Sequence, residues 1–146
     1  MRLFQIYVLL AVTVSLLACK PTAGEGGGLD FDAAWVRALP PGQPMTAAYG
    51  VLTNKQSDAL TLRSFASDQF ADVSLHRTTD QGGVSRMRPV DEIKLRPGES
   101  IALEPGGLHL MLMAPSADVS PGDHVRLSFI ADTGVQFEFS VAIEMR

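Results

Sequence analysis

Val135-Gln-Phe-Glu-Phe-Ser-Val-Ala-Ile143, together with the similar alternation across residues 125–129, decides the fold. Apolar residues recur at every second position in both stretches, which is the period of a half-buried β-strand. Turn-forming residues bound them at Pro121-Gly122-Asp123 and Asp132-Thr133-Gly134. We find no sustained helical stripe, so the pattern predicts an all-β protein.

Similar turn signals recur towards the N-terminus and divide the chain into short segments. They are Pro40-Pro41-Gly42, Asn54-Lys55, Asp80-Gln81-Gly82-Gly83, Arg96-Pro97-Gly98 and Pro105-Gly106-Gly107. This spacing predicts seven to nine strands in one antiparallel β-sandwich with Greek-key connections. The 118 residues from Leu29 to Arg146 suffice for a single hydrophobic core.

The segment Leu108-His-Leu-Met-Leu-Met113 contains the first residues with informative chemistry. In a strand the three leucines share one face, while His109, Met111 and Met113 share the other. The leucines would occupy the core, so we expect the His-Met-Met face to point outward, to water or to a rim. Taken alone, a strand histidine is more often structural than a ligand.

Two further outward-facing residues extend this donor set. In Val73-Ser-Leu-His76, Val73 and Leu75 point inward, so His76 points away from the core. In Val84-Ser-Arg-Met-Arg-Pro89, Met87 lies outside any aliphatic stripe. Together His76, Met87, His109 and Met111 offer two imidazole nitrogens and two thioether sulfurs. Such neutral, soft donors suit copper(I), whereas magnesium and calcium prefer carboxylate oxygens.

The spacing of these four residues resembles that of a known family. Ten residues separate His76 from Met87, and 21 separate Met87 from His109 in the His109-Leu-Met111 pair. This matches the H-x10-M-x21-H-x-M signature of the periplasmic copper chaperones called PCu(A)C. The resemblance extends over the domain from about residue 30, through Ala34-Trp35-Val36-Arg37, Pro40-Pro41-Gly42-Gln43, Ala48-Tyr49, Met87-Arg88-Pro89-Val90 and Pro105 to Met113.

The resemblance implies a cupredoxin-like sandwich that binds one copper(I) through His76, Met87, His109 and Met111. It also implies delivery of that ion for assembly of the copper centres of cytochrome c oxidase, to an oxidase subunit or another copper chaperone. Family members often have Glu after the first histidine, whereas Arg77 and Thr78 follow His76 here. This departure would place a positive charge near the metal. Met113 and Met45 are candidate secondary neighbours of the site.

The N-terminus indicates export. Residues 1–18 combine Arg2 with an apolar run and predict a secretory signal peptide. Leu16-Leu-Ala-Cys19 resembles the lipobox of bacterial lipoproteins, so we expect a lipid on Cys19 and a periplasmic or extracytoplasmic, membrane-anchored protein. The Gly-rich residues 19–28 would form a flexible linker, and residues 29–146 the copper-binding domain.

Composition and cysteine count narrow the function classes. Cys19 is the sole cysteine, and blue-copper electron transfer needs a cysteine ligand beside two histidines. The formal net charge of −4 does not suggest nucleic-acid binding, for which a basic face would be expected. No nucleophile, base and orienting acid form a supported triad, so we do not expect an enzyme. A metal-free adhesion or assembly module, and a copper buffering or resistance protein without a dedicated recipient, remain alternatives.

Overall fold

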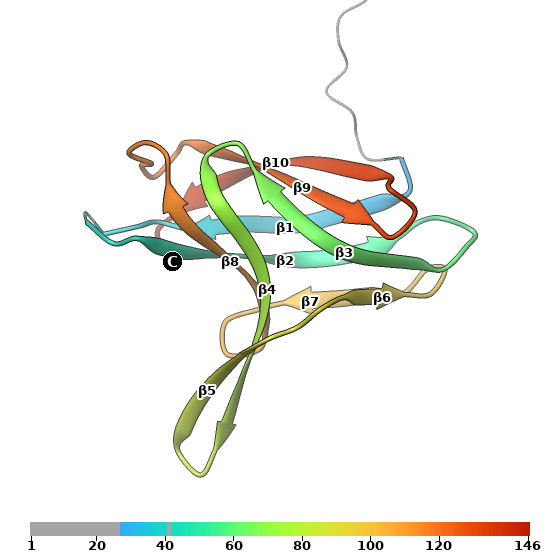
Figure 1. Ribbon diagram of the computed structural model, residues 1–146, viewed down its shortest axis with the longest axis horizontal. Coiled ribbons are helices and arrows are strands. Elements are labelled where there is room, and N and C mark those ends of the chain that lie inside the picture. The colour runs from blue at the N-terminus through green and yellow to red at the C-terminus, as the bar shows by residue number, and fades with distance from the viewer. Residues whose placement is uncertain (1–26, 41) are drawn as a thin grey trace, which may run out of the picture.

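The structure is a computed structural model that describes residues 27–40 and 42–146 (Figure 1). The predicted signal peptide, Cys19 and most of the predicted linker lie outside the described residues. None of the described segments is a helix that could cross a bilayer. The described residues form the strands β1 (Leu29–Arg37), β2 (Met45–Asn54), β3 (Leu60–Ser67), β4 (Phe70–Gln81), β5 (Val84–Pro89), β6 (Ile93–Leu95), β7 (Ser100–Leu103), β8 (Leu108–Pro115), β9 (His124–Ala131) and β10 (Gln136–Glu144).

Seven of these strands pair edge to edge into a closed ring. Their order is β4-β8-β2-β1-β10-β9-β3, and β3 pairs back onto β4. β5 pairs with β4, β6 with β3 and β7 with β2, outside the ring. The all-β prediction is confirmed. The estimate of seven to nine strands was too low, because β6 and β7 have only three and four residues and were not separated in the sequence pattern. One pair, β1 with β10, is parallel, so the expected wholly antiparallel pairing was wrong there.

The core lies inside this ring and follows the alternation of the sequence. Leu108, Leu110 and Leu112 of β8 are no more than 5% exposed, as predicted. They pack with side chains from the other strands, among which Phe129 and Phe137 are the largest that are fully buried. Because β8 pairs with both β2 and β4, its leucines fix the position of the opposite, His-Met face of the same strand.

A β-bulge in β1 adjusts the register next to this face. Asp32 pairs with Val51 and Trp35 with Tyr49, so β1 uses one residue more than β2, and Ala33 takes a positive φ of 48°. Next to the bulge there is no room for a side chain at Gly50 of β2, where a Cβ would lie 2.6 Å from a ring carbon of Phe31. The extra residue turns Trp35 onto the face of Tyr49, and their ring centroids lie 4.6 Å apart.

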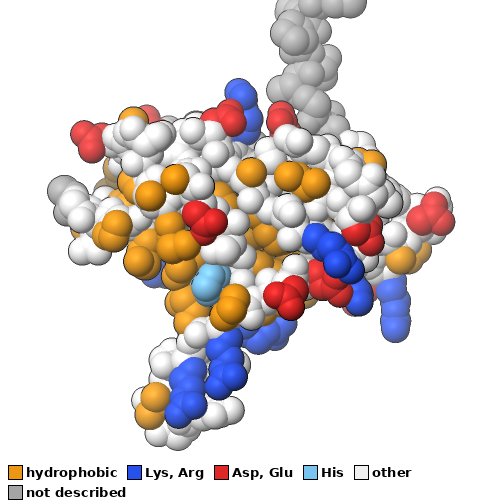
Figure 2. Space-filling view, viewed as in Figure 1, with side chains coloured by type: hydrophobic (Ala, Val, Ile, Leu, Met, Phe, Trp, Pro, Cys, Tyr) orange, Lys and Arg blue, Asp and Glu red, His pale blue; other side chains and the backbone are white. Residues whose placement is uncertain are grey.

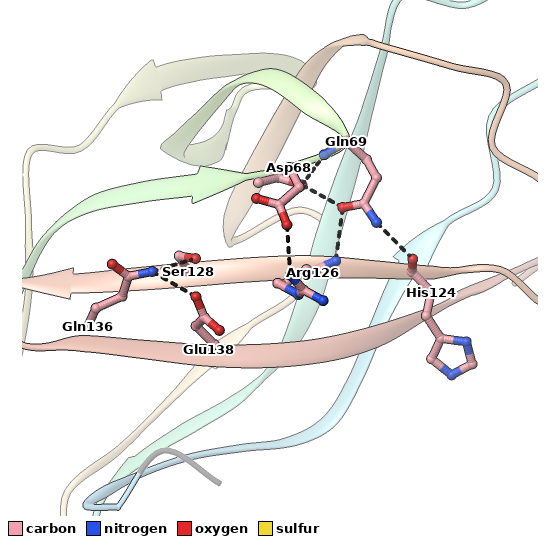
Figure 3. Close-up of polar contacts among 8 residues, drawn as sticks. Asp68, Gln69, His124, Arg126, Ser128, Gln136 and Glu138 are labelled. Carbon is pink, nitrogen blue, oxygen red and sulfur yellow. Dashed lines mark hydrogen bonds and ion pairs between the residues drawn. The ribbon is translucent and has the colours of Figure 1, made fainter. Parts of the chain in front are cut away.

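The turn between β3 and β4 is tied to β9 by side chains (Figure 3). Gln69 donates from Nε2 to the carbonyl of His124 and accepts from the backbone N–H of Arg126, at 3.2 and 3.1 Å. Asp68 pairs with Arg126 at 3.0 Å. β3 and β4 share only the pair Phe65 and Val73, so these contacts help to close the ring where β4 begins. The imidazole of His124 points away from them and is exposed, as expected for a surface residue.

Replacing Gly50 by Ala should destabilise the fold by about 2–4 kcal/mol. The new methyl group would add overpacking against Phe31 to the strain of a side chain at a φ of 152°. Denaturant unfolding followed by circular dichroism measures this loss. Gly134→Ala is the matched control, because Gly134 also has a positive φ, of 85°, but open space around it. Equal losses in the two variants would contradict the crowding at the bulge.

Candidate metal site

The antiparallel register of β4 and β8 sets His76 directly opposite His109. Their rings stack with centroids 6.2 Å apart and planes 28° apart. Each imidazole nitrogen binds a metal at about 2 Å, so this separation suits two ligands of one ion after small side-chain rotations. The two histidines come from strands that are distant in sequence and adjacent in the ring (Figure 1).

His109 is 4% exposed, which corrects the expectation that it faces water. Its Nδ1 lies 3.1 Å from the carbonyl oxygen of Gly107, an atom that only accepts, so Nδ1 carries the proton. The same carbonyl accepts the backbone N–H of Thr78 at 2.9 Å. Nε2 of His109 is then unprotonated, and its lone pair is free for a metal.

His76 is held by a short chain of polar groups on its own strand. Ser74 Oγ donates to Asp72 at 3.3 Å and lies 3.1 Å from Nε2 of His76. With the hydroxyl proton directed at the carboxylate, Ser74 accepts from Nε2–H, which leaves Nδ1 of His76 as the free donor atom. Burial and the neighbouring His109 lower the pKa of His76, and Asp72 raises it in part. The imidazole is therefore neutral at pH 7.

The two predicted methionine ligands line one open pocket of about 370 Å³ with His109. Met111 is half-buried on β8, two residues beyond His109 on the same face. Met87 lies on β5 opposite Thr78 and is 48% exposed. The structure thus brings Met87, Met111 and His109 around one space, with His76 stacked on His109 at its side.

The two candidate secondary neighbours are placed differently. Met45, at the start of β2, lines the pocket and is 47% exposed. Met113 pairs with Met45 across β2 and β8, but it is not among the residues that line the pocket. Met45 is therefore the better placed of the two, because it lines the same pocket as His109, Met87 and Met111.

Several supporting residues were not predicted as part of the site. Tyr49 is one of them, since its ring centroid lies 6.3 Å from that of His109. Burial raises the pKa of Tyr49, and the Arg37 guanidinium 5.3 Å from its ring opposes that rise. Asp72 and Ser74 could have been predicted from the sequence as neighbours of His76, since both precede it at two-residue intervals and so share its face of the strand.

Arg77 does not lie on the face of β4 that carries His76. Alternation along β4 turns its side chain to the face opposite His76, where it is exposed and pairs across to Arg88. The strand therefore separates the Arg77 guanidinium from the histidine face, whereas Arg37 lines the pocket. Among the described residues no three or more His, Cys, Asp or Glu side chains form a metal-binding group, so the candidate donors are two imidazoles and two thioethers.

Comparisons with known proteins agree with this architecture. The family model described as "Putative lipoprotein LpqE-like" matches residues 29–143. "Putative lipoprotein Lxx21020" from Leifsonia xyli subsp. xyli is 28% identical over 142 residues, covering 94% of this chain and 84% of that protein.

Solved structures show the same fold. An apo PCuAC domain from PmoF1 superposes with a TM-score of 0.68 at 18% identity, covering 84% of this chain and 98% of that domain. The solution structure of CuI-DR1885 from Deinococcus radiodurans has a TM-score of 0.63 at 28% identity, covering 86% of this chain and 87% of that chain. The predicted cupredoxin-like fold is therefore confirmed. The chain belongs to the LpqE-like family, and its predicted kinship with PCu(A)C domains is confirmed.

Proposed function

We propose that this protein is an extracytoplasmic copper(I) carrier that holds one ion between His76, Met87, His109 and Met111. The observation that carries the proposal is the register of β4 and β8, which sets two metal-competent imidazoles opposite each other beside a methionine-lined pocket. Copper is the cargo of such a protein, taken up and passed on unchanged.

The similarity to CuI-DR1885 supports copper(I) as the cargo. That protein was solved with CuI, and it matches this chain at 28% identity over most of both lengths. The chemistry of the donors points the same way, because neutral imidazoles and thioethers favour the soft cuprous ion over harder cations. Met45 is a candidate additional donor, since its side chain already lines the pocket.

The arrangement suits reversible holding. The four ligands are all neutral, so the charge of the bound ion is not compensated inside its coordination sphere. The hydrogen bonds of His109 to Gly107 and of His76 to Ser74 fix the two rings and leave the other nitrogen of each ring available to a metal. The histidines are thus preorganised, whereas Met87 on exposed β5 is free to adjust when the ion enters or leaves.

We further propose that the recipient is a copper centre of cytochrome c oxidase or another copper chaperone, and that a lipid on Cys19 anchors the protein to the membrane. The lipoprotein descriptions of the family and of the Leifsonia relative support the anchor. Residues 1–18 would then be the signal peptide, residues 19–28 the linker and residues 29–146 the copper domain. Transfer to a purified recipient separates delivery from buffering.

Anaerobic titration of the purified protein with copper(I), against a competing chromogenic chelator, tests the proposal directly. We expect one ion per chain, because the pocket and the stacked histidines form a single site. The chelator absorbance gives both the stoichiometry and the affinity. Failure to compete for copper(I) at any protein concentration would instead favour a metal-free assembly module.

Met111→Ala should weaken copper(I) binding by at least about tenfold, since loss even of an outer hydrogen-bond partner of a ligand costs 10–100-fold. The stability loss should stay below about 2 kcal/mol, the lower end for a fully buried methionine, because Met111 is only half-buried. Chelator competition and thermal melting measure the two effects. Met145→Ala is the control, because Met145 is 80% exposed and outside the pocket. A large fall in melting temperature with unchanged affinity would overturn the assignment of Met111.

Acidification should release the ion. The pKa of His76 is lowered from 6.5 chiefly by burial, so protons displace copper only below the ordinary histidine range. Affinity should therefore hold near neutral pH and fall as pH drops through the lowered pKa, while the thioethers do not titrate. Chelator competition across a pH series measures this profile. Affinity that stays constant far below pH 6.5 would mean that the imidazoles are not ligands.

A further inference from the structure

The β4–β5 hairpin projects from the body of the molecule as an arm (Figure 1). Its strands are joined by the two-residue turn Gly82-Gly83, with φ of 64° and 80°, and every residue of β5 is exposed. β5 is the last strand at its end of the strand order, and the arm meets a further strand only at its base, where Arg77 pairs with Leu108 of β8. We call residues 77–89 the basic arm.

Three arginines share one face of the basic arm. Arg77 pairs directly with Arg88, and Arg86 pairs with Thr79, two residues further along the same face. None of the three forms an ion pair with another described residue. Three cations on the body differ in this respect, because Arg63, Lys94 and Arg126 each pair with a carboxylate.

The close placement of these three arginines opposes folding of the arm. Like charges placed directly opposite each other destabilise a strand pair, and a two-stranded ribbon is marginally stable by itself. The arginine cluster is positively charged, whereas the chain as a whole has a formal net charge of −4. Figure 2 shows the basic side chains along the arm and a small hydrophobic spot near its end. Val84, next to the turn, is 54% exposed.

The opposite face of the same arm belongs to the metal pocket. Met87, Ser85 and Thr78 line that pocket, so the arginine face lies one strand thickness from a candidate copper ligand. Whatever binds the arginines is therefore held next to the ion. The arm also projects on the side of the body away from the blue end of the ribbon that leads into β1 (Figure 1).

We propose that the basic arm is the docking surface for an acidic protein, the recipient of the ion. Guanidinium groups pair with carboxylates through two parallel hydrogen bonds, and a facing acidic surface would remove the repulsion between Arg77 and Arg88. The partner's role as recipient rests on the proposed copper function. The position of the arm, away from the start of the described chain, favours a protein over the membrane that an N-terminal lipid would hold.

The test compares two triple variants of equal charge. R77Q/R86Q/R88Q removes the arm charges, and R63Q/K94Q/R126Q removes three exposed, ion-paired charges from the body. Binding to fluorescein-labelled polyglutamate is measured by anisotropy at several salt concentrations, and binding to phosphatidylglycerol vesicles by co-sedimentation. We expect the arm variant to bind polyglutamate about tenfold more weakly or worse, and the control variant to bind as the wild type does, with binding that falls steeply as salt rises.

Melting temperature and copper(I) affinity are measured on the same samples. The arm variant should melt at or above the wild-type temperature and keep its copper(I) affinity, because its arginines lie outside the pocket. Equal polyglutamate binding by the arm variant and the wild type, or no binding by either, overturns the docking surface. So does a preference of the wild type for vesicles over polyglutamate, which would assign the arm to lipid. A wild type that binds no copper(I) overturns the proposed function, while the peptide measurement still decides the docking surface.

Discussion

The candidate site depends on the register between β4 and β8. That register places His76 opposite His109, and a slip of one residue would turn one histidine into the core and a leucine out of it. The buried pairs of Leu75 with Leu110 and of Val73 with Leu112, on the reverse face of the same strands, resist such a slip because both would lose their burial. Hydrophobic packing on one side of a two-strand ladder therefore sets the metal chemistry on the other. The contacts of Gln69 and Asp68 with β9 serve the same end, since they fix the start of β4 where the ring closes.

Much of this arrangement could be predicted from the sequence because strand alternation is a local property. The alternation in residues 108–113 separated the leucines from the histidine and methionines, and the resemblance of the spacing from His76 to Met111 to the PCu(A)C signature linked strands that lie far apart in the chain. The burial of His109 could not be foreseen in the same way. It depends on Tyr49 reaching over from β2, and on a bulge at Ala33 that no glycine or proline marks. Strands as short as β6 and β7 contain too few residues to show an alternating pattern. The parallel pairing of β1 with β10 joins strands from the two ends of the domain, so no local sequence pattern indicates it.

The four candidate ligands differ in how firmly the fold holds them. His76, His109 and Met111 lie on strands of the closed ring, and both histidine rings are oriented by hydrogen bonds. Met87 lies on a strand outside the ring, all of whose residues are exposed. Local opening requires little free energy where few apolar contacts are buried, so the Met87 ligand can dissociate while the other three keep their geometry. If copper(I) binds as proposed, loss of the Met87 ligand would leave His76, His109 and Met111 on the ion and open one coordination position. An incoming ligand from another protein would occupy that position first.

The same hairpin then connects recognition to release. Met87 lies on one face of the hairpin and lines the pocket. The arginines lie on the other face and point away from the pocket. A two-stranded ribbon is thin, so a partner docked on the arginine face would lie one strand thickness from the face that carries Met87. Docking that straightens or shifts the ribbon would move the thioether of Met87 relative to His109 without disturbing the core, because no residue of β5 is buried there. Arg77 and Arg88 lie directly opposite each other in the arm, and a docked acidic surface would supply a counter-charge to both. Docking of the recipient on the arginine face would then both bring it to the copper ion and favour release of that ion.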